Sequence, residues 1–546
     1  ALFGGGVAGG DAVRWLAVAV LAYLAIAGWD IETPGLGYDE AYDAAIAVEW
    51  RHGQPLDAAG VVRVGGLTVP VMSTEIEGPL PIYLSAAVFR VFGTTVTAVR
   101  WLHIAIGAMT LGLLWTLTRR WADETAAAFA VLLCATCPPF VWWSRAGGHW
   151  NALLLPISLG MFLAWGHAWR TRRSSWMGVT GVLAGAGVTT KILFVWWLIP
   201  MVGTAWWAAR KRGGTGTWSW VSWRHRVAGA TGLAVGAAPL IVHNWPDLRT
   251  LRFVLRNLGT TELYGYRNLD LATHIASQWA AWVRVIGGDT VAFSGRPGLP
   301  VGAGLVAWAV VATTRAVWRR ARDGSPGAGD MVRVFLITSL CTIVSLSAVS
   351  TSHSGPAYLL LIIPAVWTLV GMALSDVATG SGGRGPARRV RAFVAIVAVT
   401  VVAYQGVMNV RVLRALHRTG GSGAWSDAVS QLAVVLEQEF AGRSVVAMDW
   451  GLARNLVVLT DGRLRPTEVY ERRPTPSAGA EAACASLLAD PTHVYVRHAP
   501  PHSAFPGVWE RCLRVAGEQR LALRRARLLR TRTGEPVIEI YTAEPE

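Results

Sequence analysis

Residues 99–118 read VRWLHIAIGAMTLGLLWTLT, and this run ends at Arg119-Arg120. A run of about 20 mostly apolar residues has the length that a helix needs to cross a hydrocarbon layer of about 30 Å. Arginines that directly follow such a run favour the cytoplasmic side of the membrane. The segment therefore predicts a transmembrane helix whose carboxyl end lies in the cytoplasm.

The same alternation of apolar blocks and Arg clusters recurs along the 546 residues, of which 53% are hydrophobic and only 15% charged. This is more apolar surface than a water-soluble protein can cover, so the sequence predicts an α-helical polytopic membrane protein. We expect eleven spans, at roughly 13–30, 99–118, 124–141, 150–169, 174–190, 192–209, 227–243, 299–314, 331–350, 356–373 and 392–408. They place the N-terminus in the cytoplasm and the C-terminus outside the plasma membrane.

The formal net charge of +16 would suggest nucleic acid as a partner of a soluble protein. Here the arginines stand in short segments between the apolar blocks, and the aromatic side chains that line nucleic-acid grooves are absent from them. We interpret these clusters as cytoplasmic anchors. They are Arg119-Arg120, Arg170-Arg172-Arg173, Arg210-Lys211-Arg212, Arg315-Arg319-Arg320-Arg322 and Arg384-Arg388-Arg389-Arg391.

The first span has a second interpretation. Ala25-Ile26-Ala27 resembles a signal-peptidase site that follows an apolar run. The residues before the run are rich in Gly and not strongly basic, which favours a retained span. Cleavage would leave the later topology unchanged.

Three parts are expected outside the membrane: loops 31–98 and 244–298, and a tail at 409–546. The tail alternates expected helices (425–440, 451–459) with expected strands (444–448, 493–497, 536–541), so it predicts a soluble α/β domain attached to a membrane domain at 1–408. It contains no phosphate-cradling glycine motif.

The five cysteines fall into two groups. Cys134 and Cys137 form a CxxC inside an expected span, where apolar packing is favoured over redox or zinc chemistry. Cys484 and Cys512 both lie in the external tail, where an oxidising compartment permits a disulfide. The sequence leaves that bridge open.

The first external loop begins with the sequence Gly37-Tyr38-Asp39-Glu40. Two adjacent carboxylates at the edge of a low-dielectric layer repel each other, and one of them can become a usable base. The alternative is a solvated helix start, since acidic residues favour helix N-termini.

Farther along, this loop reads Ser73-Thr74-Glu75-Ile76-Glu77-Gly78-Pro79-Leu80-Pro81-Ile82-Tyr83, and Val99-Arg100-Trp101 enters the second span. With the acidic pair before them, these elements resemble the GT-C class of membrane glycosyltransferases, in particular the protein O-mannosyltransferase and aminoarabinose-transferase group. The resemblance covers about 400 residues and leaves out the tail. Later elements appear in the order of that group: Pro138-Pro139-Phe140, Ser144-Arg145, Gly181, Gly185 and Gly187 before Thr190-Lys191, and His353 to Tyr358 with Pro364.

The sequence also departs from the group. An Asp is common after the Ser-Arg element, whereas this chain reads Gly147-Gly148-His149-Trp150-Asn151, so the role of that Asp cannot be carried over. The Pro-Pro-Leu element is altered to Gly78-Pro79-Leu80. Glu77 before it resembles a metal-contacting Glu of the aminoarabinose transferases. The resemblance thus allows a divalent metal at Glu77, and no cofactor is otherwise expected.

The resemblance implies that a sugar moves from a polyprenyl-phosphate donor to a hydroxyl of a glycan, lipid or protein acceptor, with inversion, on the extracytoplasmic side. Asp39 would be the general base and Glu40 its orienting neighbour. The donor phosphate would meet the group Lys191, Arg145, His353, Arg256, Arg267 and Tyr358. The acceptor or sugar would meet the group Tyr38, Glu77, His149, Trp150 and Asn151.

Arg145 and Lys191 have an alternative to phosphate binding: their charged groups could extend to the lipid headgroups. It is weaker for Lys191, because the chain has only two lysines. Two other functions stay open. A lipid-linked sugar transporter or flippase would need charged or broken helices at mid-membrane and an inverted repeat. A non-catalytic cell-envelope assembly protein would tolerate Asp39→Asn.

Overall fold

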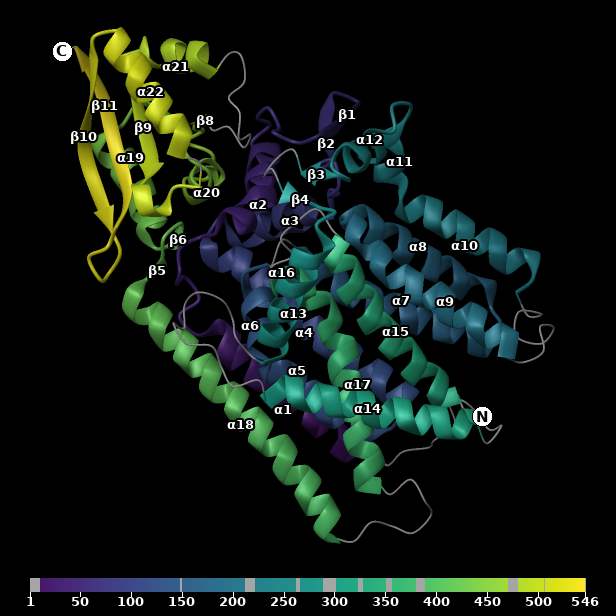
Figure 1. Ribbon diagram of the computed structural model, residues 1–546. Coiled ribbons are helices and arrows are strands. Elements are labelled where there is room, and N and C mark those ends of the chain that lie inside the picture. The colour runs from purple at the N-terminus through teal and green to yellow at the C-terminus, as the bar shows by residue number, and fades with distance from the viewer. Residues whose placement is uncertain are drawn as a thin grey trace.

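The computed structural model describes residues 10–147, 150–211, 221–261, 266–287, 301–322, 328–349, 356–379, 388–469, 480–504 and 506–545. Figure 1 shows a large helical bundle and, at its upper left, a smaller region built around a sheet. The long helix α18 leads from the bundle to the smaller region. The mostly helical fold with an α/β C-terminal region agrees with the prediction.

Every expected span coincides with a helix, or with a succession of shorter helices. The bundle contains α1 (Gly10–Gly28), α4 (Val96–Trp121), α5 (Glu124–Thr136), α6 (Pro138–Arg145), α7 (Asn151–Thr171), α8 (Ser174–Thr190), α9 (Val195–Lys211), α10 (Trp223–Gly236), α11 (Ala238–Asn244), α14 (Val301–Arg322), α15 (Ala328–Val349), α16 (Pro356–Leu359), α17 (Ile363–Thr379) and α18 (Arg388–Thr419). Among the described residues, six helices are long and apolar enough to cross a membrane, or eight if two bent pairs each count as one span. The expected number of eleven crossings stays a prediction.

Two expected spans are not straight. The block at 124–141 bends by 61° between α5 and α6, and the block at 227–243 bends by 65° between α10 and α11. Pro138 and Pro139 begin α6, because proline fits the first turn of a helix and interrupts a continuing one. The expected loop 244–298 also holds helices: α12 (Arg249–Arg256) and α13 (Leu271–Gly287). Helix α13 packs against α14, α15 and α16.

Helices α8 and α10 approach each other through glycines. A Cβ added at Gly185 would lie 2.3 Å from the carbonyl oxygen of Leu233, and one at Gly232 would lie 2.1 Å from that of Gly178. Small residues at such positions let two helix backbones touch within a membrane. The contact fixes the carboxyl end of α8, after which Lys191 follows.

A middle layer lies between the bundle and the C-terminal region (Figure 1). It contains α2 (Tyr38–Arg51), the hairpin β1 (Gly60–Val64) and β2 (Leu67–Met72), and α3 (Leu80–Phe92). Helix α2 is buried on nearly all sides, because its alanines pack among apolar side chains of α3, the start of α4, and α20 (Ala453–Leu459). Short side chains therefore let α2 sit at the centre of the molecule.

The C-terminal region has a five-stranded sheet in the order β10-β11-β9-β7-β8. Its strands are β7 (Ser444–Ala447), β8 (Thr467–Glu468), β9 (His493–His498), β10 (Leu521–Arg530) and β11 (Pro536–Pro545), and its helices are α19 (Ala428–Glu439), α20, α21 (Ala480–Leu488) and α22 (Pro506–Glu518). Alternate strand residues face opposite sides: Val445 packs with α19 and α20, and Val446 with α21 and α22. Helices thus cover both faces of the sheet.

The cysteines behave as two groups. Cys484 of α21 and Cys512 of α22 form a disulfide, which answers the question that the sequence left open. Cys134 and Cys137 are both buried in the apolar core of the bundle, as expected for packing residues.

We expect Gly185→Ala to lower the free energy of unfolding by about 1–3 kcal/mol, because the added methyl group meets a backbone carbonyl that cannot easily move. Thermal unfolding of the detergent-solubilised protein measures this. The matched control is Gly304→Ala on α14, where nothing lies within 4 Å of the new Cβ. Equal effects of the two variants would contradict the tight α8–α10 contact.

Candidate functional site

A buried ion pair holds the start of α2. The guanidinium of Arg100 on α4 donates to both Glu40 oxygens, from Nε at 2.9 Å and from Nη2 at 3.0 Å. It also donates to the carbonyl oxygens of Ile31, Pro34 and Gly35. Glu40 in turn accepts from the backbone N–H of Gly37 at 2.8 Å. The carboxylate of Glu40 is therefore engaged in holding the loop that precedes α2.

Arg145 of α6 holds the same loop from the other side. Its Nη1 donates to the carbonyl oxygen of Trp29 at 2.7 Å, and its Nη2 donates to those of Asp30 at 2.5 Å and Thr33 at 2.6 Å. The side chain is 1% exposed. In the structure the predicted phosphate ligand Arg145 thus binds backbone carbonyls.

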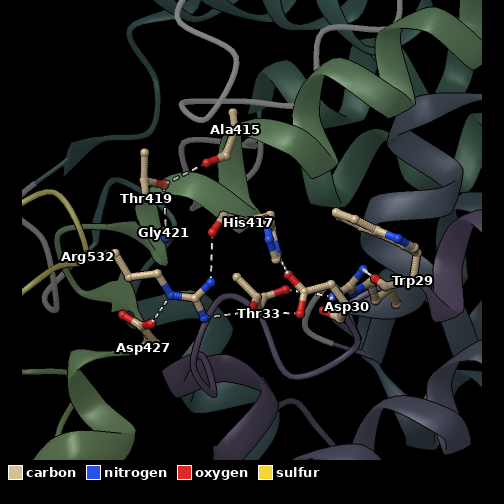
Figure 2. A network of polar contacts seen from close by, with 10 residues as sticks. Trp29, Asp30, Thr33, Ala415, His417, Thr419, Gly421, Asp427 and Arg532 are labelled. Atoms are coloured by element: carbon tan, nitrogen blue, oxygen red, sulfur yellow. Dashed lines mark hydrogen bonds and ion pairs between the residues drawn. The ribbon is translucent and has the colours of Figure 1, made fainter.

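The C-terminal region fastens this loop as well, as Figure 2 shows. Arg532 donates to Asp427 at 2.6 Å, to the carbonyl oxygen of His417 at 2.7 Å and to the hydroxyl of Thr33 at 3.1 Å. The ring Nδ1 of His417 lies 3.0 Å from Oδ2 of Asp30. Residues 29–36 are therefore held by α4, α6, the end of α18 and the turn between β10 and β11.

Asp39 lies just beyond this loop, beside a small cavity of about 40 Å³ that opens to the outside. Its side chain is half-buried, whereas that of Glu40 is buried. The cavity is lined by Pro34, Gly35, Gly37, Asp39, Glu40, Arg100, Trp142, Trp143, Ala146 and Trp425. The two neighbouring carboxylates therefore have different surroundings, and Asp39 is the more accessible one.

Lys191 lies in the neighbourhood of Asp39. Its Nζ is 2.6 Å from Oε1 of Glu77 and 5.1 Å from the ring centroid of Tyr358. The charge of Asp39 also acts on it. The lysine side chain is 2% exposed. The cation thus pairs with Glu77, lies against the Tyr358 ring and is under the electrostatic influence of Asp39.

Backbone pairing fixes the Lys191–Glu77 contact. Gly78 N–H donates to the carbonyl oxygen of Thr190, and Ile192 N–H donates to that of Ile76. A Cβ at Gly78 would lie 2.3 Å from the carbonyl oxygen of Thr189. This close approach gives a physical reason for glycine at this position.

Asp43 lies one helical turn after Asp39 on α2, and the charges of Glu77 and Lys191 act on it. It is 2% exposed, and its Oδ1 has no hydrogen-bond partner among the described residues. Burial and, after it, the negative charge of Glu77 raise the pKa of this carboxyl to about 7, while Ser73, Lys191 and Arg454 act in the opposite direction.

The C-terminal region supplies a further wall. The Tyr38 hydroxyl donates to Glu468, with 3.3 Å to each carboxylate oxygen, and the Tyr38 ring lies 4.9 Å from that of Trp450. The Arg454 guanidinium lies 4.6 Å from the centroid of the Tyr42 ring. Both tyrosines belong to α2, so this wall adjoins Asp39 and Asp43.

The structure therefore brings six of the predicted residues together: Tyr38, Asp39, Glu40, Glu77, Lys191 and Tyr358. Trp150 and Asn151 lie elsewhere: both are buried at the start of α7, and the Trp150 ring packs on His103. Arg256 and Arg267 are exposed. His149 and His353 fall outside the described residues.

Sequence reasoning missed Asp43, Arg454, Glu468 and the three tryptophans of the cavity. Asp43 could have been found, because residues i and i+4 share one face of a helix. The others could not, because distant parts of the chain bring them there.

The described residues contain no group of three or more His, Cys, Asp or Glu side chains that could hold a metal ion. Glu77, the predicted metal contact, is paired with Lys191. We therefore derive no step through a metal.

The family model for dolichyl-phosphate-mannose-protein mannosyltransferases matches residues 76–242. ArnT from Cupriavidus metallidurans bound to undecaprenyl phosphate is 16% identical, with a TM-score of 0.57 over 98% of each chain. The apo state of that protein is 17% identical, with a TM-score of 0.57 over 97% of each chain. An oligosaccharyltransferase of Archaeoglobus fulgidus is 13% identical, with a TM-score of 0.50 over 89% of this chain and 68% of its own. No curated protein matches the sequence.

We expect Glu40→Gln to lower the free energy of unfolding by about 3–5 kcal/mol, because Arg100 would keep a buried charge without its partner. Chemical or thermal unfolding measures the loss. Glu32→Gln, at an exposed position within the same loop, is the control and should change little, because Gln keeps an oxygen that accepts from Thr97. A Glu40→Gln variant as stable as the control would contradict this role.

The pKa of Asp43 gives a pH prediction. The folded state favours the protonated carboxyl, so the free energy of unfolding should fall as the pH rises from about 4, the ordinary pKa of Asp, to about 7. Asp43→Asn removes this titration, so the difference in melting temperature between variant and wild type should grow in favour of the variant over that range. A difference that does not change with pH would contradict the prediction.

Proposed function

We propose that this membrane protein, whose fold is that of the GT-C class of glycosyltransferases, transfers a sugar from a polyprenyl-phosphate donor to an acceptor hydroxyl on the extracytoplasmic side. The observation that carries the proposal is the position of Asp39. It lines an open cavity and lies close enough to the buried cation Lys191 for its charge to act on that lysine. A base close to both a phosphate-binding cation and a space for an acceptor is what glycosyl transfer from a lipid phosphate requires.

Asp39, Lys191 and Glu40 have different roles in this reaction. The hydroxyl of the acceptor loses its proton to Asp39, and its oxygen forms the bond to the anomeric carbon. The bond from that carbon to the phosphate oxygen breaks on the opposite face, so the configuration inverts and polyprenyl phosphate leaves. Lys191 stabilises the charge on the leaving phosphate. Glu40, bound by Arg100, is a positioning residue that orients the first turn of α2.

Lys191 is the cation that we assign to the phosphate. Arg145 is engaged by carbonyl groups, and Arg256 is exposed. ArnT was solved with undecaprenyl phosphate, and its fold matches this chain along nearly the whole length, which supports a lipid phosphate as the carrier. Tyr358 lies against Lys191 and would contact the same ligand.

We place the catalytic side outside the cytoplasm. The Arg clusters then lie inside, as the positive-inside rule demands, and the C-terminal region lies outside. The Cys484–Cys512 disulfide supports this orientation, because disulfides persist in oxidising compartments.

We expect Asp39→Asn to lower turnover by about 10²- to 10⁴-fold, because the amide cannot take up the proton of the acceptor. The assay incubates the purified protein with a panel of radiolabelled polyprenyl-phosphate sugars and follows consumption of the donor. Asp490→Asn, on the surface of the C-terminal region, is the control. If Asp39→Asn consumes donor as fast as wild type, the assignment of the base is wrong, and a non-catalytic assembly role gains support.

We expect Lys191→Met to weaken binding of undecaprenyl phosphate by about 10- to 100-fold, because a charged hydrogen bond to the phosphate is lost. Equilibrium binding to the protein in nanodiscs measures this. Arg256→Met, which removes an exposed cation, should leave the affinity unchanged. Equal losses in both variants would point to nonspecific charge attraction instead of a site at Lys191.

A further inference from the structure

Helix α12 presents leucines to the outside of the protein. Leu251 and Leu255 lie one turn apart on this helix and are 50% and 58% exposed. Leu248 and Leu258, which flank the helix, are exposed as well, and so is Trp245 just before it. Single exposed apolar side chains are common on protein surfaces, whereas a row of them along one short helix indicates that this surface contacts something apolar.

The same helix turns two polar side chains inward. Thr250 and Asn257 are only 7% and 2% exposed. The hydroxyl of Thr250 donates to the carbonyl oxygen of Glu75 at 2.7 Å, and it accepts from the side-chain amide of Asn244 at 3.0 Å. A helix on a water-exposed surface usually turns its leucines toward the protein instead. The arrangement in α12 therefore indicates an apolar medium on its outer side.

The position of α12 in the chain indicates which medium this is. Helices α10 and α11 together are long and apolar enough to cross a membrane, and α11 ends at Asn244. Helix α12 begins shortly afterwards at Arg249, and the side-chain oxygen of Asn244 accepts from the backbone N–H of Thr250 at 2.9 Å. Figure 1 shows α12 beside α11 and near the hairpin of β1 and β2. Helix α12 is therefore held at the end of a span, where the hydrocarbon layer meets the headgroups.

The charges of α12 favour an anionic surface. Arg249, Arg252 and Arg256 are exposed beside the leucines, and the acidic residue in the segment 245–258 is Asp247. Arginines that anchor the topology belong on the cytoplasmic side, whereas α12 lies on the external side in the orientation that the Arg clusters favour. Its arginines therefore need another explanation, and the phosphates of anionic headgroups provide one.

From these observations we infer that α12 lies flat on the outer leaflet of the membrane and binds anionic phospholipids. Its leucines and Trp245 enter the outer part of the acyl-chain layer, and its arginines contact headgroup phosphates. The contact of Thr250 with Glu75 connects this helix to the segment that carries Glu77. A helix fixed at the headgroups thus sets the depth of that segment in the membrane. The lipid contact does not depend on the reaction proposed for the site.

The position of α12 can be measured with a fluorescent label on a cysteine. Leu255→Cys is combined with Cys341→Ser, because Cys341 is exposed, whereas the free cysteines Cys134 and Cys137 are buried and do not compete for the label. The labelled full-length protein is placed in nanodiscs, and quenching by phosphatidylcholine with a doxyl group on its acyl chain is recorded. The matched control is Leu513→Cys in the same background, which labels an exposed leucine of α22 in the C-terminal region.

We expect the label at position 255 to be quenched several-fold more strongly than the label at position 513, because acyl chains reach only the former. Equally weak quenching of the two labels would overturn the inference, since α12 would then face water or another protein.

The headgroup of the quencher tests the arginines. We expect doxyl-labelled phosphatidylglycerol to be enriched over doxyl-labelled phosphatidylcholine at position 255. The double variant Arg249→Gln with Arg252→Gln should reduce this enrichment roughly 5-fold or more, because each arginine near the surface attracts anionic lipid. The control, Arg514→Gln with Arg524→Gln, changes two exposed arginines of the C-terminal region that take part in surface ion pairs, as Arg249 does.

The control should keep the enrichment, and thermal unfolding shows that both double variants are folded. Equal quenching by the two lipids before the arginines are changed would contradict the inference. An equal loss of enrichment in the control would contradict it too, because the attraction would then come from the charge of the whole protein.

Discussion

The candidate site depends on one interaction, the buried ion pair between Arg100 and Glu40. Both side chains are nearly inaccessible, and a buried charge is tolerated only when hydrogen bonds satisfy it. Arg100 meets this condition because it donates hydrogen bonds to two carboxylate oxygens and to three carbonyl oxygens of the loop. The need to satisfy one guanidinium therefore determines the path of residues 31–40.

This constraint explains how two neighbouring carboxylates acquire different roles. The carboxylate of Glu40 accepts hydrogen bonds from Arg100 and from the backbone N–H of Gly37, so its role is structural. Asp39 belongs to the first turn of α2, which the Glu40–Arg100 pair holds in place, and it lines the cavity. Lys191 meets Glu77 because glycines bring α8 against α10 and the backbone of residues 76–78 pairs with that of 190–192. The site is thus assembled by buried ion pairs together with backbone contacts.

The sequence predicted those parts of the fold that depend on interactions between residues close together in the chain. Apolar blocks of membrane length predicted the helices, and alternating strand and helix patterns predicted the α/β region. Helix α13 was missed because it lies within a segment with no apolar block of membrane length, and it is stabilised by packing on α14 to α16. Arg145 and Arg100 carry the same charge at the same expected depth, and only the structure shows that both hold loop carbonyls. Trp425 and Arg454 join the site through contacts between distant parts of the chain, which no local pattern encodes.

The links between the C-terminal region and the middle layer have a consequence for biosynthesis. Arg532 reaches Thr33 across 499 positions of sequence, and Asn455 reaches the carbonyl oxygen of Leu36 across 419. Such contacts cannot form while the chain is still being made, because the later residues do not yet exist. The loop before Asp39 therefore lacks these two contacts until Asn455 and Arg532 have been synthesised. Residues 33–36 thus reach their final structure only after the C-terminal region has folded against them.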